Sequence, residues 1–217
     1  MIFTHGTREI AAEIHSLIVA GWTGRDAGAV AHHIEELREI GVAPPSATPL
    51  FYRVSRSLLT QEDEIEVLGP ASSGEAEPFL LRHEGAAWLG LASDHTDREL
   101  ETLSVAASKQ ACPKICARAI WPYGEVEGHL DALLLRSWVR EGGDWVAYQD
   151  GALAVMLPLG QLMDAAPLTS GSAMLCGTVP AIGGIRPAPA FRAELHDPVL
   201  GRSITLEYRI TALPVIS

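Results

Sequence analysis

The sequence predicts an α+β domain, in which two helices accompany many short β-strands. Residues 26–41 combine the apolar spacing of an amphipathic helix with signals at both of its ends. Residues 94–108 are rich in strong helix formers and predict a second helix. Most other apolar segments are short and are bounded by turn residues, which is typical of strands in a mixed sheet.

The N-terminal part of the chain leads into the clearest helix. Apolar positions in residues 1–23 suit a short helix or strands, and the segment ends in SLIVAGW (16–22), which predicts a buried strand. Asp26 can then cap a helix that Gly41 can close. The apolar residues between them recur at steps of three and four, as the buried stripe of a helix requires. They are Ala27, Val30, Ile34 and Leu37.

The rest of the chain is predicted to be rich in strands. The expected strand segments are 49–59, 64–69, 78–93, 130–139, 144–149, 172–179 and 203–210. The pair Glu84–Gly85 predicts a hairpin turn inside 78–93. Residues 180–190 are rich in proline and glycine but lie between strands, so they predict a loop rather than a linker. We expect one domain over residues 1–217, with residues 1–20 as an N-terminal appendage.

The composition excludes several classes of protein. The 217 residues include 16 Lys and Arg against 27 Asp and Glu, a formal net charge of −11, which argues against binding to nucleic-acid phosphates or anionic lipid. A hydrophobic fraction of 47% with 20% charged residues is that of a folded chain. Cys112, Cys116 and Cys176 form no Cys-x-x-Cys motif, so we expect free thiols. Because the sequence shows no signal-peptide pattern, we expect a cytoplasmic protein without membrane or nucleic-acid partners.

Two acidic groups could hold a cation. In the segment GEAE (74–77), Glu75 and Glu77 would point to the same face of a strand, close enough to share one ion. A solvated strand face is the alternative interpretation. Asp94 lies next to His95 where an apolar run meets a predicted helix, and it could serve either as a ligand or as the cap of that helix.

Three further groups could contribute to catalysis or binding. On the clearest helix, His33 and Glu36 flank the apolar stripe at a spacing of three, so the carboxylate could orient the imidazole and raise its basicity. An ordinary surface pair is the alternative. Lys109 follows the second predicted helix. Gly177 and Thr178 form a turn after an apolar strand and could offer N–H groups and a hydroxyl to an anion, although many loops do so without a function.

Taken in order, these fragments resemble the motifs of the fumarylacetoacetate hydrolase superfamily. Its members typically show Gly-Arg-Asn before a helix with His-x-x-Glu, then Phe-x-Lys-Pro-Ser, Glu-x-Glu, Asp-x-Thr-Ala-Arg-Asp, Lys-Ser, Gln-x-Gly and a late Gly-Thr. In those places this chain has GRD (24–26), HIEE (33–36), LFYRVS (50–55), EAE (75–77), DHTDRE (94–99), SK (108–109), YQDG (148–151) and CGTVPAIGG (176–184). Each fragment alone is weak, but the shared order over residues 21–210 is specific.

The resemblance implies a mixed β-sandwich roll with a few peripheral helices, and it implies roles for individual residues. Glu75, Glu77 and Asp94 match three carboxylate ligands of a divalent ion, and all-oxygen ligation favours Mg²⁺ or Mn²⁺ over zinc. The remaining matches concern catalysis and substrate. His33 and Glu36 correspond to a pair that activates water, Lys109 to a lysine that stabilises negative charge on substrate oxygens, Gly177 and Thr178 to a turn that holds a substrate carboxylate, and Arg25 and Gln149 to positions that line the pocket.

The activity implied by the resemblance is cleavage of a C–C bond in a small 2-oxo acid or β-dicarbonyl substrate. Such a reaction passes through a metal-stabilised enolate, as in the hydrolysis of an acylpyruvate. Decarboxylation, isomerisation or hydration of an oxo acid on the same scaffold are alternatives, as is a non-catalytic protein that binds a metal and a small acid. The resemblance also implies a homodimer.

The chain departs from the superfamily pattern at several positions. The segment between Glu77 and Asp94 is shorter than usual and leaves room for a hairpin only. Arg53 stands where a lysine is usual, and Glu99 replaces the second aspartate of the Asp-x-Thr-Ala-Arg-Asp pattern. Substrate specificity therefore does not carry over from the superfamily. Residues 117–133 have no counterpart, and we expect core packing from the aromatic and imidazole side chains there, Trp121, Tyr123 and His129.

Overall fold

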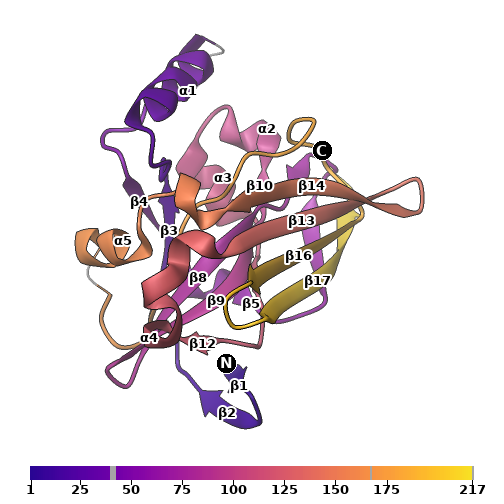
Figure 1. Cartoon of the computed structure of the whole chain (residues 1–217). Helices are drawn as coiled ribbons and strands as arrows, with labels where there is room; N and C mark the ends of the chain where they lie inside the picture. Colours follow the sequence, from indigo (N-terminus) through magenta and orange to yellow (C-terminus); the bar gives the residue numbers. More distant parts are fainter. Residues whose placement is uncertain (40–42, 167, 217) are drawn as a thin grey trace.

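The computed structural model of the chain describes residues 1–39, 43–166 and 168–216, without the side chains of His33 and Leu37. Two β-sheets pack face to face, and short helices lie around them (Figure 1). This arrangement confirms the predicted α+β class and its mixed β-sandwich. None of the described helices is long and apolar enough to cross a membrane.

The larger sheet has eight strands. Seven of them follow the order β4 (Leu50–Val54), β3 (Ser16–Gly21), β15 (Ser172–Leu175), β8 (Ala76–His83), β9 (Ala86–Asp94), β11 (Lys114–Cys116) and β5 (Leu59–Thr60), and β12 (Trp121–Pro122) also pairs with β9. The pairs β3–β15 and β5–β11 are parallel, whereas the others are antiparallel. Strands β8 and β9 therefore lie in the interior of a mixed sheet, where both edges of each strand are paired.

The smaller sheet has five strands, in the order β14 (Asp144–Ala152), β13 (Leu134–Glu141), β16 (Ala190–Asp197), β17 (Arg202–Leu213) and β6 (Glu64–Leu68). Only the β6–β17 pair is parallel among them. Two short antiparallel pairs complete the described strands. They are β1 (Ile2–His5) with β2 (Arg8–Ala11), and β7 (Ser72–Ser73) with β10 (Thr96–Asp97).

Helices are few and mostly short. The described α-helices are α1 (Ala27–Glu39), α2 (Arg98–Glu101), α3 (Val105–Ala111), α4 (Tyr123–Val126) and α5 (Leu159–Ala165). The 3₁₀ helices are η1 (Arg56–Leu58), η2 (Glu127–Ala132) and η3 (Leu153–Val155). Only α1 is long enough to form three turns.

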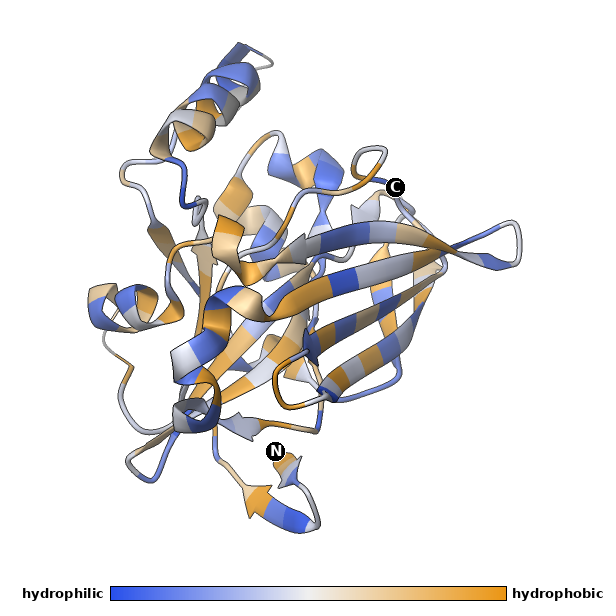
Figure 2. Cartoon of the chain, viewed as in Figure 1, coloured by the Kyte–Doolittle hydropathy of each residue, from blue (hydrophilic) through white to orange (hydrophobic). Residues whose placement is uncertain are grey.

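The larger hydrophobic core lies between the two sheets, because strands of both sheets carry apolar side chains at alternate positions (Figure 2). On β8, Leu80 belongs to this core, whereas Phe79 and Leu81 belong to a second core on the opposite face. The hairpin β1–β2 contributes Phe3 to the second core, and its ring lies 6.0 Å from that of Phe79. Both faces of β8 are therefore buried along most of its length.

The local signals of α1 and of the β8–β9 hairpin act as predicted. Asp26 caps α1, since its Oδ1 accepts the backbone N–H groups of Gly28 at 2.8 Å and Ala29 at 3.1 Å. The expected closing residue Gly41 lies outside the described residues. Glu84 and Gly85 have φ angles of +49° and +80°, which form the mirror-image turn that fits two twisted antiparallel strands.

Other elements differ from the prediction for identifiable reasons. The second expected helix is split into α2 and α3, because Ser104 starts a new helix by accepting the N–H of Ala107 at 3.3 Å. Leu103, just before this break, is 82% exposed. The strand expected at 130–139 begins only at Leu134, since η2 occupies the preceding residues, and β16 and α5 were not predicted.

Candidate active site

Strands β8 and β9 bring the three predicted metal ligands to one face of the larger sheet. Ala76 pairs with Ser93 in the antiparallel ladder, and the N–H of Asp94 donates to the carbonyl of Glu75 at 2.9 Å. Because side chains alternate along a strand, Glu75, Glu77 and Asp94 lie on the same side. The predicted convergence of two separate acidic segments is therefore present in the backbone register.

The three carboxylates are largely shielded from water. Asp94 is fully buried, Glu77 is 3% exposed and the side chain of Glu75 is 15% exposed. Ala92, which lies opposite Glu77 on β9, is fully buried as well. Since a buried carboxylate needs a counter-charge or hydrogen bonds, its partners determine what the site can do.

Asp94 has a lysine on each of its oxygens. Lys109, from α3, places Nζ 2.5 Å from Oδ2, and Lys114, from β11, places Nζ 3.0 Å from Oδ1. Lys114 is fully buried and also donates to the carbonyl of His95 at 2.5 Å. Burial alone would raise the pKa of Asp94, but the two lysines outweigh it and hold the pKa below its ordinary value.

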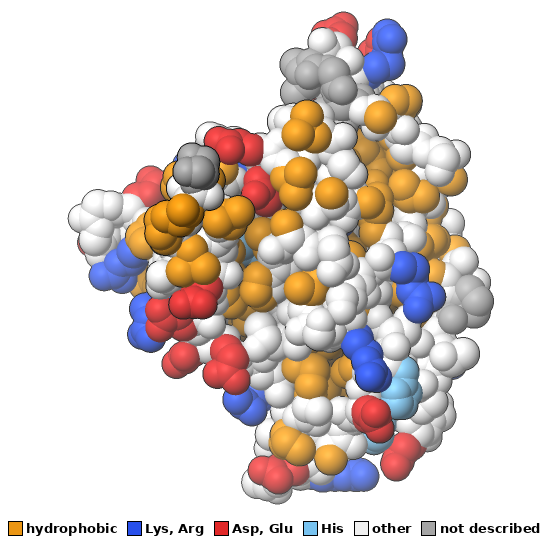
Figure 3. Space-filling view, turned by 180° about the vertical axis from the view of Figure 1, so that it is seen from behind, with side chains coloured by type: hydrophobic (Ala, Val, Ile, Leu, Met, Phe, Trp, Pro, Cys, Tyr) orange, Lys and Arg blue, Asp and Glu red, His pale blue; other side chains and the backbone are white. Residues whose placement is uncertain are grey.

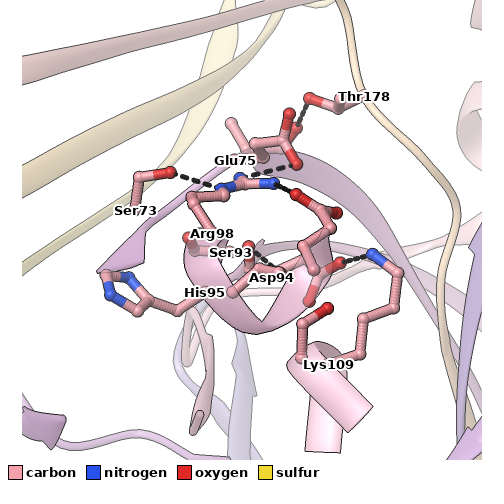
Figure 4. Close-up of polar contacts among 12 residues, drawn as sticks. Ser73, Glu75, Ser93, Asp94, His95, Arg98, Lys109 and Thr178 are labelled. Carbon is pink, nitrogen blue, oxygen red and sulfur yellow. Dashed lines mark hydrogen bonds and ion pairs between the residues drawn. The ribbon is translucent and has the colours of Figure 1, made fainter. Parts of the chain in front are cut away.

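Glu75 is bound by an arginine from α2 (Figure 4). Arg98 places Nη2 3.0 Å from Oε2 of Glu75, and its Nη1 donates to Oε2 of Glu101 at 2.8 Å. Its Nε donates to Oγ of Ser73 at 2.7 Å. The guanidinium is therefore held at three points, two of which do not involve Glu75.

Glu77 has no such cation bound to it among the described side chains. Its Oε2 accepts the backbone N–H of Gly177 at 2.7 Å. Burial raises the pKa of Glu77 well above its ordinary value, and the nearby charge of Asp94 raises it further. Gly177 has a φ of +93°, and a Cβ at this position would overlap Oγ1 of Thr23, so the turn can approach Glu77 only as glycine.

The predicted substrate-binding residues Gln149 and Thr178 support the start of β8. Oε1 of Gln149 accepts from the N–H of Ala76 at 2.9 Å and from Oγ of Ser137 at 2.6 Å. Its Nε2 donates to Oγ1 of Thr178 at 2.5 Å and to the carbonyl of Val179 at 2.8 Å. The Thr178 hydroxyl itself donates to the carbonyl of Ala76 at 2.7 Å. In this structure these polar groups are used to hold the backbone beside Glu77.

On the opposite face of the larger sheet, His95 joins the two sheets. Its Nδ1 lies 2.9 Å from the hydroxyl of Tyr208 on β17, and its Nε2 lies 2.9 Å from Oγ of Ser72. The Tyr208 hydroxyl is also 2.8 Å from Oγ of Ser93. Burial lowers the pKa of His95 to about 3, so the imidazole is neutral at pH 7. These hydrogen bonds hold the end of β9 on the face opposite the three carboxylates.

Arg25 is bound elsewhere. Its guanidinium forms two hydrogen bonds with the carboxylate of Asp131, at 2.8 and 2.6 Å, and its Nε donates to the carbonyl of Met156 at 2.8 Å. Arg25, Asp131 and His129 lie around a surface cavity of about 310 Å³ between η2, η3 and α5. The described contacts therefore do not link Arg25 to the three carboxylates.

The predicted water-activating pair lies on α1, which extends away from the two sheets (Figure 1). The side chain of His33 lies outside the described residues. Glu36 is exposed, and its Oε1 lies 3.3 Å from Nε2 of His32. Seen from behind, charged side chains lie at the end of this projection, and hydrophobic side chains lie on the surface next to its base (Figure 3).

The donor set fits a hard divalent cation in its chemistry, since it consists of three carboxylates on one face. Glu77 in particular is a buried acid with a raised pKa, which a cation would stabilise in its charged form. Within the described residues, however, no three His, Cys, Asp or Glu side chains are grouped closely enough to hold an ion as they stand. Arg98 and the two lysines pair with two of the three carboxylates instead.

The sequence analysis proposed the acids and Lys109 as site residues but did not propose Lys114 or Arg98. Arg98 lies inside the motif segment DHTDRE (94–99), and Lys114 lies five residues after Lys109 of the motif SK (108–109). The signal for Lys114 is a lysine at the start of an otherwise apolar three-residue strand, where a charged side chain must find a buried partner.

Similar solved structures share the whole fold. Cg1458 with an inhibitor has a TM-score of 0.69 and 15% identity, over 96% of this chain and 84% of that one. A 2-keto-3-deoxy-D-arabinonate dehydratase, complexed with magnesium and 2,5-dioxopentanoate, has a TM-score of 0.64 and 14% identity, over 94% of this chain and 75% of that one. The 4-oxalocrotonate decarboxylase from Pseudomonas putida G7, complexed with calcium and acetate, has a TM-score of 0.55 and 16% identity, over 89% of this chain and 76% of that one.

These structures are enzymes of the fumarylacetoacetate hydrolase superfamily, so the chain has the fold of that superfamily and the resemblance stated from its motifs is confirmed. A family profile described as "Protein of unknown function (DUF2848)" matches residues 20–208, and the chain belongs to that family. No curated protein matches the chain in sequence.

Proposed function

We propose that the chain is a divalent-metal-dependent enzyme that acts on a small 2-oxo acid or β-dicarbonyl substrate. The observation that carries this proposal is the alignment of Glu75, Glu77 and Asp94 on one face of β8 and β9, next to Lys109. The proposal is supported by two enzymes of the same fold whose complexes contain magnesium and calcium.

In this proposal, Glu75, Glu77 and Asp94 hold Mg²⁺ or Mn²⁺. When bound, such an ion polarises a carbonyl group and stabilises the negative charge that develops as a neighbouring bond breaks. Gln149 and Thr178 keep the Ala76 backbone in place, and Gly177 orients Glu77. The three acids therefore have supports that fix their backbone before any ligand arrives.

Lys109 supplies the positive charge that faces the substrate. Burial would lower the pKa of Lys109, but Asp94 and Glu77 outweigh burial and raise it, so the ammonium stays charged at pH 7. Its Nζ lies 2.5 Å from Oδ2 of Asp94 and 5.8 Å from the centroid of the Tyr52 ring. Because Lys114 also pairs with Asp94, the ammonium of Lys109 can turn toward a substrate oxygen without leaving Asp94 unpaired.

For the specific reaction, we propose hydrolysis of an acyl–carbon bond. His33 would take a proton from a water molecule that adds to the acyl carbonyl, and Glu36 would orient the imidazole. The C–C bond then breaks to give a carboxylic acid and an enolate, which takes up one proton. This role requires α1 to lie over the acidic face when substrate is bound.

Decarboxylation and dehydration are the second candidate, because enzymes with these names share the fold. Loss of carbon dioxide needs no activated water. A His33→Ala variant that loses hydrolysis of acylpyruvates but still decarboxylates a β-oxo acid would assign the hydrolytic role to His33. Equal loss of both activities would contradict it.

Calorimetric titration with Mg²⁺ and Mn²⁺ tests the proposal, together with assays on acylpyruvates, β-oxo acids and 3-deoxy-2-oxo sugar acids. We expect one divalent ion per chain, weaker binding to Glu77→Gln, and turnover of at least one oxo acid that depends on the ion. Arg136→Met, on the smaller sheet, is the control and should bind the ion as the wild type does. Binding without turnover would favour a metal- and acid-binding protein, and absence of specific divalent binding both with and without an added oxo acid or oxalate would refute the proposal.

A further inference from the structure

The three carboxylates of the proposed ion site belong to a cluster in which acidic and basic side chains almost balance. We call this group the acid–base cluster. Its members are Glu75, Glu77, Asp94, Glu101, Arg98, Lys109 and Lys114. Four acidic side chains face three basic ones, so the cluster carries one net negative charge when all seven groups are ionised.

Two of the three cations are fixed. Lys114 is fully buried and binds both Asp94 and the carbonyl of His95, so its departure would leave two buried acceptors unpaired. Arg98 is held by Glu101 and Ser73 as well as by Glu75. Neither group can be displaced by an incoming ion without a large loss of hydrogen bonds.

An incoming divalent ion alone would make this buried cluster positive. Because excess charge is costly where water is excluded, the cluster should bind a bare Mg²⁺ ion weakly. The described acids are also paired with protein cations instead of being gathered around a vacant centre. A chelating dianion that arrives with the ion would cancel its charge and leave the balance unchanged.

We propose that Arg98 and Lys114 are fixed counter-charges that make binding of the divalent ion depend on a chelating, doubly negative ligand. The inference rests on the proposed function and narrows it. The ligand class is a 2-oxo acid that binds through two adjacent oxygens and carries two negative charges as its enolate. Oxalate has the same two-oxygen chelate and the same charge, whereas acetate has neither.

The linkage is measured by calorimetry on the wild-type chain. Mg²⁺ is titrated in the absence of added anion, with oxalate and with acetate, and the fits are corrected for the Mg²⁺–oxalate complex in solution. We expect oxalate to tighten Mg²⁺ binding by at least about tenfold, within the roughly 5- to 150-fold range of coupled sites, and acetate to leave it unchanged. By reciprocity, Mg²⁺ must tighten oxalate binding by the same factor.

A charge-removing variant tests the residue assignment. Lys114→Met keeps the side-chain volume but removes one counter-charge, so Mg²⁺ without oxalate should bind at least about tenfold tighter and the oxalate effect should shrink. Arg136→Met removes the same charge from the smaller sheet and should change neither quantity. A purely structural role for Lys114 predicts the opposite sign, namely weaker binding of Mg²⁺.

The outcomes separate the two claims. Mg²⁺ that binds equally well with and without oxalate would overturn the inference and leave the proposed function standing. Absence of Mg²⁺ binding under every condition would refute both. If Lys114→Met does not fold, as judged by circular dichroism, the reciprocal titrations of the wild-type chain still decide the inference.

Discussion

Replacing Gly177 with alanine tests the turn that holds Glu77. Gly177 has a φ of +93°, a region that residues with a Cβ avoid. The added Cβ would overlap Oγ1 of Thr23 and lie 3.0 Å from its Cβ, and Thr23 is only 4% exposed. The substitution must therefore shift the turn, and with it the N–H that donates to Glu77 at 2.7 Å.

The cost follows from three separate effects. The left-handed backbone costs about 1–2 kcal/mol for alanine. Overpacking against Thr23 adds about 1–3 kcal/mol. A weakened hydrogen bond to the carboxylate of Glu77 adds up to about 2 kcal/mol. We expect the free energy of unfolding to fall by about 2–7 kcal/mol, and Mg²⁺ binding to weaken because Glu77 is no longer oriented.

Urea unfolding at constant pH measures this loss, and Gly184 supplies a matched control. Gly184 has a φ of +85°, but a Cβ there meets no atom within 4 Å. Gly184→Ala should therefore cost only the conformational part, about 1–2 kcal/mol. If both variants lost the same stability to within about 0.5 kcal/mol, the contact with Thr23 would not explain the glycine, and the reasoning would be refuted.

Three further predictions concern charge, capping and pH. Lys109→Met should lower the turnover of an oxo-acid substrate about 100- to 1000-fold, with an unchanged circular dichroism spectrum, because it removes the cation that stabilises substrate oxygens; unchanged turnover would contradict this role. Asp26→Ala should reduce amide-exchange protection in α1 by about fivefold, since a lost N-cap costs about 1 kcal/mol; protection equal to wild type would contradict the capping. Burial lowers the pKa of His95 to about 3, and the charges of Lys114 and Arg98 add to the effect. As pH falls below about 6.5, the His95 imidazole is therefore protonated in the unfolded chain while it stays neutral in the folded chain. The unfolding free energy should therefore lose about 3 kcal/mol from this group between pH 7 and pH 4, and His95→Gln should remove that part of the difference in urea unfolding. The raised pKa of Glu77 favours the folded state on acidification, and this opposite effect is the same in the wild type and in His95→Gln. If the unfolding free energies of the wild type and His95→Gln depended equally on pH, the burial of a neutral His95 would be contradicted.

Local sequence signals predicted the fold correctly where a short turn determines the backbone conformation. The Glu84–Gly85 turn is an example, since a two-residue turn pairs His83 with Ala86. Counting outward along the same ladder places Glu75 opposite Asp94. Glu75 lies nine residues before the turn, and Asp94 lies nine residues after it. Once the hairpin is recognised, the sequence therefore predicts that the two acidic segments lie side by side.

Elements that depend on tertiary packing were not predicted. Strand β16 is different, because it alternates buried and partly buried residues regularly, with Phe191, Ala193 and Leu195 facing the core, so its period-two signal was present in the sequence but was not recognised. Helix α5 has only seven residues, and the burial of Leu159 and Leu162 against the rest of the chain stabilises it. No local pattern in so short a segment separates a helix from a loop.

The partners of the acids were also beyond sequence reasoning, because they come from other elements. Gln149 was predicted near the site, but its two bonds to Ala76 and Thr178 depend on the packing of the smaller sheet against β8. A glutamine with both ends of its amide bonded to the protein has little capacity left for a substrate. The pocket-lining role of Gln149 therefore stays a prediction, and the structure assigns its side chain to the backbone beside Glu77.

The two lysines on Asp94 illustrate why residue type alone does not define a metal site. A single lysine beside a carboxylate could bind the substrate, compete with the ion for the carboxylate, or stabilise the fold. With Lys114 fully buried on β11 and Lys109 at 7% exposure on α3, the two positive charges have different access to the acidic face. Lys114 pairs with Asp94 and also donates to the carbonyl of His95, whereas the hydrogen bond of Lys109 goes to Asp94, so Lys109 is the lysine that we expect to turn toward a ligand. A carboxylate neutralised in this way attracts a bare cation less, and selectivity for an ion that arrives with its own anion follows from the same pairing.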